Sequence, residues 1–241
     1  MQEQTRTDNE LVLLTESIDE TPNPHKALDE PDGLCAVGGD LSAKRLIHLY
    51  SKGFFPWYND PDPILWWHPK ERCVLAPQRF HASRSLRKAR KKDNWSFTIN
   101  QAFSTVIHHC AKLRVQKEGT WISREMKNAY QTLHQLGYAH SIESRIDNEL
   151  VGGFYGVAMG KILFGESMFS LHAHASKMAL SFFCKITSQL GIDLIDCQVK
   201  SDHLISLGAH MMPRSQFIAS LEQLITTPNK NLLLVNLSSF E

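Results

Sequence analysis

The chain has 241 residues, 42% hydrophobic and 21% charged, a composition that fits one large or two unequal globular domains and excludes a disordered or fibrous chain. Its formal net charge of +1 excludes nucleic-acid binding through overall charge and leaves only local clusters for that purpose. Apolar runs fall short of the roughly 20 residues that span a bilayer, and residues 1–10 lack a signal-peptide core, so we expect a cytoplasmic protein without a membrane partner.

The cysteines and histidines form no pattern typical of a disulfide framework or a metal site. The five cysteines are scattered without a Cys-x-x-Cys pair. The pairs His108-His109 and His172-x-His174 have no carboxylate or thiol at a metal-site spacing. We therefore expect no bound metal and interpret these histidines as surface or capping residues.

Two features mark the N-terminal part of the chain. Residues 1–24 end in a turn-prone stretch with two prolines, and we expect a frayed or loosely docked leader. Gly38-Gly39 could suggest a phosphate loop, but neither Lys-Ser nor Lys-Thr follows. The glycines instead favour a tight turn into a helix at 43–50, with Asp40 or Ser42 as its N-cap.

Tryptophan and proline are concentrated between residues 54 and 69. Three of the five tryptophans and four of the ten prolines fall there. A segment broken by so many prolines is expected to form neither a regular helix nor a central strand. Its aromatic side chains could plug a domain junction, as large aromatics commonly do, or could stack on a nucleobase.

A dense basic cluster follows a predicted strand at 73–77. Seven cations lie within fourteen residues, and Asp93 alone follows to offset them: Arg79, Arg84, Arg87, Lys88, Arg90, Lys91 and Lys92. The positions 84, 87, 88 and 91 share one face of a helix. This face is either a contact surface for phosphates or an ordinary solvated face.

The central part predicts two helices and then a β-meander. The helices are expected at 99–113 and 123–136. From residue 139 the hydrophobic period changes to two, and strands are expected at 141–146, 150–159 and 162–169. Glu166 lies among apolar residues of the third strand, so it is either exposed at an edge or part of an interior site.

A predicted helix at 176–190 leads into a strand at 192–198, which ends in Asp196, Cys197 and Gln198. Burying these groups is costly unless they are paired or used, although the strand could simply run out into a loop. Side chains alternate along a strand, so Asp196 and Gln198 should share one side and Cys197 should face the other. A thiol nucleophile at Cys197 acting with His203 is a weaker alternative, since that histidine need not face it.

The element order is completed by helices at 201–207 and 215–225. A meander followed by alternating helices and strands indicates an α+β fold with one mixed sheet and helices on its faces. An acetyltransferase would suit this order. The pyrophosphate loop of acyl-coenzyme A enzymes, however, is missing after the meander.

Eight short motifs, taken together in this order, resemble the leucyl/phenylalanyl-tRNA–protein transferase family. They are Pro31-Asp32-Gly33-Leu34, Gly38-Gly39-Asp40-Leu41-Ser42, Phe55-Pro56-Trp57, Ile64-Leu65-Trp66-Trp67, Ser83-Arg84-Ser85, Gly119-Thr120-Trp121-Ile122, Gly165-Glu166-Ser167-Met168-Phe169-Ser170 and Leu194-Ile195-Asp196-Cys197-Gln198. The resemblance implies a small N-terminal domain, residues 1–70, and an acetyltransferase-like (GNAT-like) domain, residues 71–241. The latter would hold a mixed, mostly antiparallel sheet flanked by helices.

The resemblance also implies an activity. A monomer would transfer Leu or Phe, and sometimes Met, from its tRNA to the N-terminal Arg or Lys of an acceptor protein. That addition marks the acceptor for N-degron degradation. Neither coenzyme A nor another cofactor is implied, because the aminoacyl ester of the tRNA is already activated.

Site residues follow from the same resemblance. Asp196 would accept a proton from the attacking amine or orient it, Gln198 would hold Asp196 or the amine in line, and Glu166 would bind the basic acceptor or the donor amine. Phe154, Phe183 and Tyr130 would form the Leu/Phe pocket, where Phe154 departs from the methionine expected in Gly-Gly-Met-Tyr-Gly. Trp57 and Trp121 would stack on the terminal adenosine, and a basic cluster including Arg84, Lys91 and Lys92 would hold the acceptor stem.

Two other classes remain open from the residues alone. One is an acyl-coenzyme A N-acyltransferase, which a coenzyme A titration would separate. The other is a non-catalytic tRNA-binding module, which a test for peptide-bond formation would separate.

Overall fold

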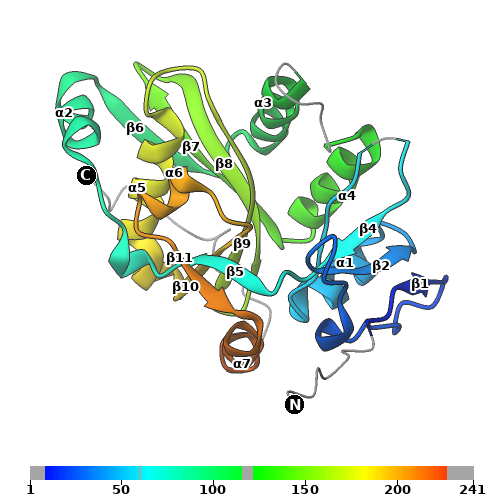
Figure 1. Ribbon diagram of the computed structural model, residues 1–241. Coiled ribbons are helices and arrows are strands. Elements are labelled where there is room, and N and C mark those ends of the chain that lie inside the picture. Colours follow the sequence, from blue (N-terminus) through cyan, green and yellow to red (C-terminus); the bar gives the residue numbers. More distant parts are fainter. Residues whose placement is uncertain (1–8, 60, 116–121, 227–241) are drawn as a thin grey trace, which may run out of the picture.

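The computed structural model describes residues 9–59, 61–115 and 122–226, which form two sheets (Figure 1). The smaller sheet has the order β1-β2-β4-β3 and consists of β1 (Val12–Leu14), β2 (Leu34–Gly38), β3 (Phe55–Pro56) and β4 (Leu65–Trp67). The larger sheet has the order β11-β5-β10-β9-β8-β7-β6 and consists of β5 (Glu71–Leu75), β6 (Trp95–Ile99), β7 (Ala139–Ile146), β8 (Glu149–Met159), β9 (Ile162–Ser170), β10 (Leu194–Gln198) and β11 (His210–Pro213).

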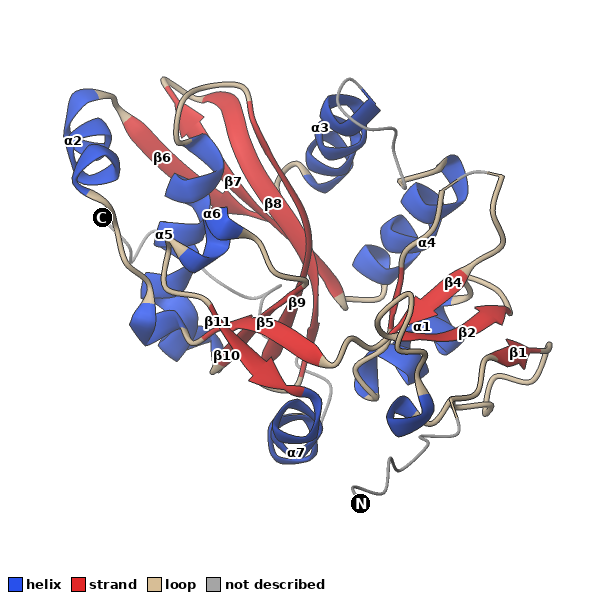
Figure 2. Ribbon diagram, viewed as in Figure 1, coloured by secondary structure: helices blue, strands red, loops and turns tan. Residues whose placement is uncertain are grey.

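Helices cover both faces of the larger sheet. The α-helices of the described residues are α1 (Ala43–Ser51), α2 (Arg84–Lys92), α3 (Phe103–Val115), α4 (Arg124–Gln135), α5 (Ala175–Leu190), α6 (Asp202–Ile205) and α7 (Arg214–Leu224). Figure 2 shows α5 on one side of the sheet and α3 and α4 on the other. Two separate apolar clusters correspond to these sides, one around α5 and one that joins α3 and α4 to the smaller sheet.

The predicted α+β class is confirmed, including the mixed and mostly antiparallel sheet. β9 and β10 run parallel, and every other neighbouring pair in the larger sheet is antiparallel. Glycine allows α5 to approach this sheet closely. A Cβ added at Gly152 would lie 2.4 Å from the Cβ of Ala175, so a larger residue there would push the start of α5 away.

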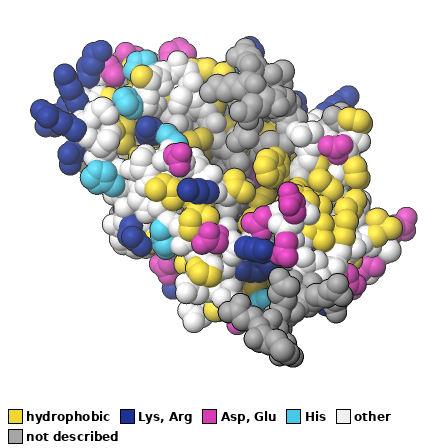
Figure 3. All heavy atoms as spheres, viewed as in Figure 1, with side chains coloured by type: hydrophobic (Ala, Val, Ile, Leu, Met, Phe, Trp, Pro, Cys, Tyr) yellow, Lys and Arg dark blue, Asp and Glu magenta, His cyan; other side chains and the backbone are white. Residues whose placement is uncertain are grey.

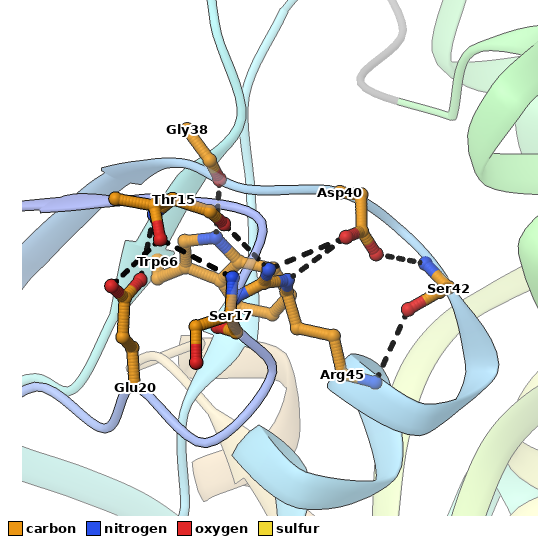
Figure 4. A network of polar contacts seen from close by, with 8 residues as sticks. All are labelled: Thr15, Ser17, Glu20, Gly38, Asp40, Ser42, Arg45 and Trp66. Carbon is orange, nitrogen blue, oxygen red and sulfur yellow. Dashed lines mark hydrogen bonds and ion pairs between the residues drawn. The ribbon is translucent and has the colours of Figure 1, made fainter.

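The predicted leader is wrong for the residues that the structure describes. β1 pairs in parallel with β2, and the fully buried guanidinium of Arg45 holds the following segment (Figure 4). Arg45 donates from Nη2 to the carbonyl of Thr15 at 2.7 Å and from Nη1 to that of Ser17 at 3.2 Å. Its Nε also contacts Asp40 at 3.3 Å. One buried arginine therefore fastens residues 15–17 to the start of α1.

The predicted turn into α1 is confirmed. Ser42 is the N-cap, and its hydroxyl accepts the N–H of Arg45 at 3.4 Å. Asp40 accepts the N–H of Ser42 at 2.7 Å. Gly38 and Gly39 both adopt positive φ angles, of 88° and 71°, which explains the glycine pair without any bound phosphate.

Two predictions need correction, and strand β11 has no predicted range. β4 is an inner strand of its sheet, because Pro63 and Pro69 lie outside its three residues and remove none of its ladder hydrogen bonds. Ile99 ends strand β6 instead of starting a helix, since Asn100 turns the chain at a φ of 61° and α3 begins at Phe103. β11 lacks the alternation that would have predicted it.

The two sheets share one apolar core. Phe54, Phe55 and Trp66 from the smaller sheet side pack in the same cluster as Val74 of β5 and Phe164 of β9. This contact fixes residues 54–57 beside the middle of β9 and the end of β10, where the site lies. No helix within the described ranges is both long and apolar enough to cross a bilayer.

Candidate active site

A pocket of about 300 Å³ lies where the aromatic segment meets β8, β9 and β10. Most of its lining is apolar, with a small polar group on β9 and β10. The lining residues are Phe55, Pro56, Trp57, Phe154, Tyr155, Gly165, Glu166, Ser167, Met168, Leu180, Ile195, Cys197, Gln198, Val199, Ser201, His203 and Leu204. An apolar cavity with few convergent polar groups is the usual form of a small-ligand site.

Glu166 is the hub of the polar group. Its carboxylate accepts hydrogen bonds from Tyr50 at 2.7 Å, from Tyr130 at 2.8 Å and from the side-chain amide of Gln198 at 2.8 Å. The residue is 6% exposed. Burial raises the pKa of Glu166 to about 7, although these three hydrogen bonds oppose that rise. Near neutral pH the carboxyl group can therefore hold or release a proton.

The two tyrosines stay protonated beside it. Burial, followed by the charge of Glu166, raises the pKa of both Tyr50 and Tyr130 well above the ordinary value. Their hydroxyl oxygens are 2.6 Å apart, and each also contacts the carboxylate. Three contacts link the two hydroxyl groups and the carboxylate, but the hydroxyl groups supply protons for only two of them. A proton on Glu166 would supply the third hydrogen bond.

Asp196 is held apart from the pocket by Arg72 of β5. Arg72 donates to both carboxylate oxygens of Asp196, at 2.8 and 2.6 Å, and both side chains are fully buried. The guanidinium lies between the rings of Phe55 and Phe217, at 4.7 and 4.6 Å from their centroids. The carboxylate also accepts the backbone N–H of Gln198 at 2.8 Å.

The predicted alternation along β10 is wrong at its end. The ladder with β5 is irregular between Asp196 and Gln198, and Gln198 has a φ of 64°. This bulge turns Gln198 toward Glu166, and Cys197 lines the pocket while Asp196 does not. Cys73 and burial hold the pKa of Cys197 well above the ordinary value, which disfavours the thiolate that a nucleophile needs.

The three aromatic residues predicted for the Leu/Phe pocket differ in how directly they contact it. Phe154 lines the pocket, and Phe183 stands behind it, edge to face at 5.7 Å between centroids. Tyr130 does not line the pocket, and it contacts the site through its hydrogen bond to Glu166. Met168, Leu180 and Ile195 complete the apolar wall, and their pattern in the sequence is that of ordinary core residues.

Trp57 is at the mouth of the pocket and is 41% exposed, whereas Trp66 is fully buried. Trp57 lies tilted against Trp67 with 5.8 Å between ring centroids. The aromatic segment thus buries the ring of Trp66 in the core and exposes the ring of Trp57 to solvent. Trp121 lies outside the described residues.

Six of the seven cations of the basic cluster lie on the helix α2, which Ser83 caps, and Arg79 lies in a 3₁₀ turn before it. Arg84, Lys91 and Lys92 are exposed and do not line the pocket, and Leu86 is the buried residue of the helix. Figure 3 shows Lys and Arg side chains gathered over α2. Among the described residues, no group of three or more His, Cys, Asp or Glu side chains could hold a metal ion.

Two important residues were missed from the sequence. Tyr50 shares the apolar face of α1 with Leu46 and Leu49, so it resembles a core residue. Arg72 stands alone between Glu71 and Cys73, and no spacing connects it with Asp196, which is 124 positions away. A buried strand that carries an arginine is the one available signal, because an arginine there needs a partner.

Comparison with known sequences indicates the family of this chain. A family model described as leucyl/phenylalanyl-tRNA protein transferase matches residues 74–222, and the model of its N-terminal domain matches residues 39–70. The leucyl/phenylalanyl-tRNA–protein transferase of Idiomarina loihiensis is 52% identical over 200 residues, 83% of this chain and 85% of the relative. That of Nitrosospira multiformis is 50% identical over 204 residues, 85% of this chain and 88% of the relative.

Likeness to solved structures is weaker. The crystal structure of FemX aligns over 60% of each chain with a TM-score of 0.45 and 11% identity. An aminoglycoside N-acetyltransferase aligns over 54% of this chain and 89% of its own, with a TM-score of 0.33 and 14% identity. These values carry no argument about function.

The α+β fold and the family matches define an enzyme that transfers an aminoacyl group from tRNA to a protein. The chain belongs to the leucyl/phenylalanyl-tRNA–protein transferase family. Its substrates are an aminoacyl-tRNA and an acceptor protein.

Proposed function

We propose that this pocket transfers Leu or Phe, and sometimes Met, from tRNA to the α-amine of an acceptor whose first residue is Arg or Lys. The observation that supports this best is a carboxylate, Glu166, in a pocket whose apolar wall includes Phe154, Met168, Leu180 and Ile195. An apolar amino acid with a charged α-ammonium needs both environments. Glu166 therefore binds the donor α-ammonium, and the apolar wall holds the donor side chain.

The reaction needs no cofactor and no coenzyme A. The acceptor nitrogen bonds to the ester carbonyl carbon, the carbon–oxygen bond to the ribose breaks, and the nitrogen proton ends on the ribose oxygen. A terminal amine has a pKa of about 7.7–8.0, so a useful fraction is neutral near pH 7. The enzyme then works mainly by positioning that amine against the carbonyl.

Gln198 is the residue that contacts the amine. Its amide N–H donates to Glu166, which fixes the amide plane and leaves the amide oxygen as an acceptor for the incoming N–H. Asp196 is a positioning residue. Its carboxylate, saturated by Arg72, holds the backbone N–H of Gln198 and supports the bulge.

The tRNA contacts extend away from the pocket. Trp57, with Trp121, stacks on the terminal adenosine, and Arg84, Lys91 and Lys92 hold the acceptor stem through its phosphates. Residues 1–70 and 71–241 serve as the two domains of a cytoplasmic monomer. The new N-terminal Leu or Phe marks the acceptor for N-degron degradation.

The direct test supplies radiolabelled leucyl-tRNA, phenylalanyl-tRNA and acetyl-coenzyme A with peptides that begin with Arg, Lys or Ala. Transfer from both tRNAs to the Arg and Lys peptides alone is expected. Transfer from acetyl-coenzyme A, or equal transfer to the Ala peptide, would contradict the proposal.

A further inference from the structure

The basic helix α2 is held against the side of α5. Arg90 of α2 lies over the ring of Phe97 at 5.8 Å, and Phe97 stacks on Phe182 of α5 with 4.8 Å between centroids. The indole of Trp95 also donates to the carbonyl of Ala89 at 3.1 Å. These contacts give the cations of α2 a fixed position relative to α5.

Two lysines of α5 extend this positive surface. Lys185 is largely exposed. Partial burial and the nearby charge of Arg90 on α2 both lower the pKa of Lys185, and the closeness of Arg90 puts Lys185 at the junction of α5 with α2. Lys177 is half-buried two turns earlier, and the pKa of His203 is lowered by burial and by the charge of Lys177. His203 lines the pocket, so Lys177 lies at the pocket end of the helix.

The spacing places both lysines on one face. Residues 177 and 185 are two intervals of four apart, with the buried Ser181 between them, and the two lysines are separated by about 12 Å along the helix axis. Neither α2 nor α5 contains an acidic residue, and both helices are fully described. Within the described residues neither ammonium has an ion-pair partner. In the sequence, Asp93 directly follows α2 and Asp202 directly precedes His203.

We propose that Lys177 and Lys185 bind the phosphates of the single-stranded 3′ end of the aminoacyl-tRNA and guide it from α2 to the pocket. This inference rests on the proposed function and adds a contact that the acceptor stem does not make. The charged side chains of α2 and α5 are all positive, and the two helices pack together. Because this surface leads from the basic cluster to a pocket wall, it suits a phosphate backbone better than a protein segment.

The test compares three leucyl donors with an Arg-starting peptide as acceptor. Leucyl-adenosine has no phosphate, leucyl-CCA trinucleotide has the single-stranded end, and leucyl-tRNA adds the stem. For Lys177→Ala with Lys185→Ala, kcat/KM should fall about tenfold with the last two donors and stay unchanged with leucyl-adenosine. The slope of log affinity for leucyl-tRNA against log salt should flatten by about 1.4, since each single-strand phosphate contributes about 0.7.

The matched control is Lys44→Ala with Lys112→Ala, which removes two exposed lysines from α1 and α3 and should change none of the three rates. Replacing Arg84, Lys91 and Lys92 with Ala should lower kcat/KM with leucyl-tRNA. The same change should leave the rates with leucyl-CCA and leucyl-adenosine unchanged, because these donors lack the acceptor stem. An unchanged rate with leucyl-CCA, or an equal loss with leucyl-adenosine, would overturn the inference. If the unaltered protein transferred nothing from leucyl-tRNA, the proposed function itself would fail.

Discussion

The buried pair of Arg72 and Asp196 allows the role of Asp196 to be separated from its structural contribution. Changing Arg72 to Met leaves a buried carboxylate without its bidentate partner, which should cost about 3–5 kcal/mol of unfolding free energy. Changing Asp196 to Ala leaves the arginine alone and should cost a similar amount. Loss of activity in either single variant therefore cannot distinguish positioning from proton transfer.

The informative variant combines Arg72→Met with Asp196→Asn. Methionine can fill the space between Phe55 and Phe217 through favourable sulfur–aromatic contacts. The asparagine oxygen can still accept the N–H of Gln198, while its amide N–H groups remain unsatisfied at a cost of about 1–3 kcal/mol. The double variant should therefore be more stable than Arg72→Met alone, as urea unfolding would measure.

Single-turnover transfer of labelled Leu to an Arg-starting peptide then decides the role. If Asp196 only positions Gln198, the double variant should transfer within about tenfold of the unaltered rate, well short of the 10²–10⁴-fold typical of a lost acid–base group. A loss of that larger size, in a variant that circular dichroism shows to be folded, would refute the positioning role.

Three further changes test other parts of the structure. Because the pKa of Glu166 is raised to about 7, the folded state binds more protons than the unfolded state between pH 4.5 and 7, and its contribution to stability is lost as pH rises through that range. Glu166→Gln should remove that component, of order 3 kcal/mol, from urea unfolding measured across this range, and an unchanged pH profile would argue against a protonated Glu166. Arg45→Met should cost about 2–3 kcal/mol and open residues 15–17 to proteolysis, whereas Lys44→Met on the exposed face of α1 should do neither. Phe154→Ala enlarges the donor pocket and should raise the kcat/KM ratio of phenylalanyl-tRNA to leucyl-tRNA about tenfold or more, and an unchanged ratio in competition would remove Phe154 from donor selection.

Much of the fold follows from local patterns in the sequence. The period of two after residue 139 predicts the meander, and the serines at 42 and 123 mark helix starts that the structure confirms. β6 and β11 escape this reasoning because their register depends on neighbouring strands that are distant in sequence. The segment after β1 is held by Arg45, whose partners lie 28 and 30 positions away.

The site is less predictable than the fold. Glu166 and Gln198 stand out as polar residues in apolar strands, and the structure brings them to 2.8 Å. The bulge at the end of β10 could not be read from alternation, since a strand pattern contains no signal for one extra residue. Tyr50 and Arg72 owe their places to packing between the two sheets, which no local spacing encodes.

The positioning of the acceptor amine by Gln198 is tested most directly by the single-turnover rate of Gln198→Ala. With saturating leucyl-tRNA and an Arg-starting peptide, the rate should fall about 10²-fold while the affinity for leucyl-tRNA stays the same. Cys197→Ala, one residue earlier in the same pocket wall, is the matched control and should transfer near the unaltered rate. A rate for Gln198→Ala within about twofold of the unaltered protein would contradict the proposed role of Gln198.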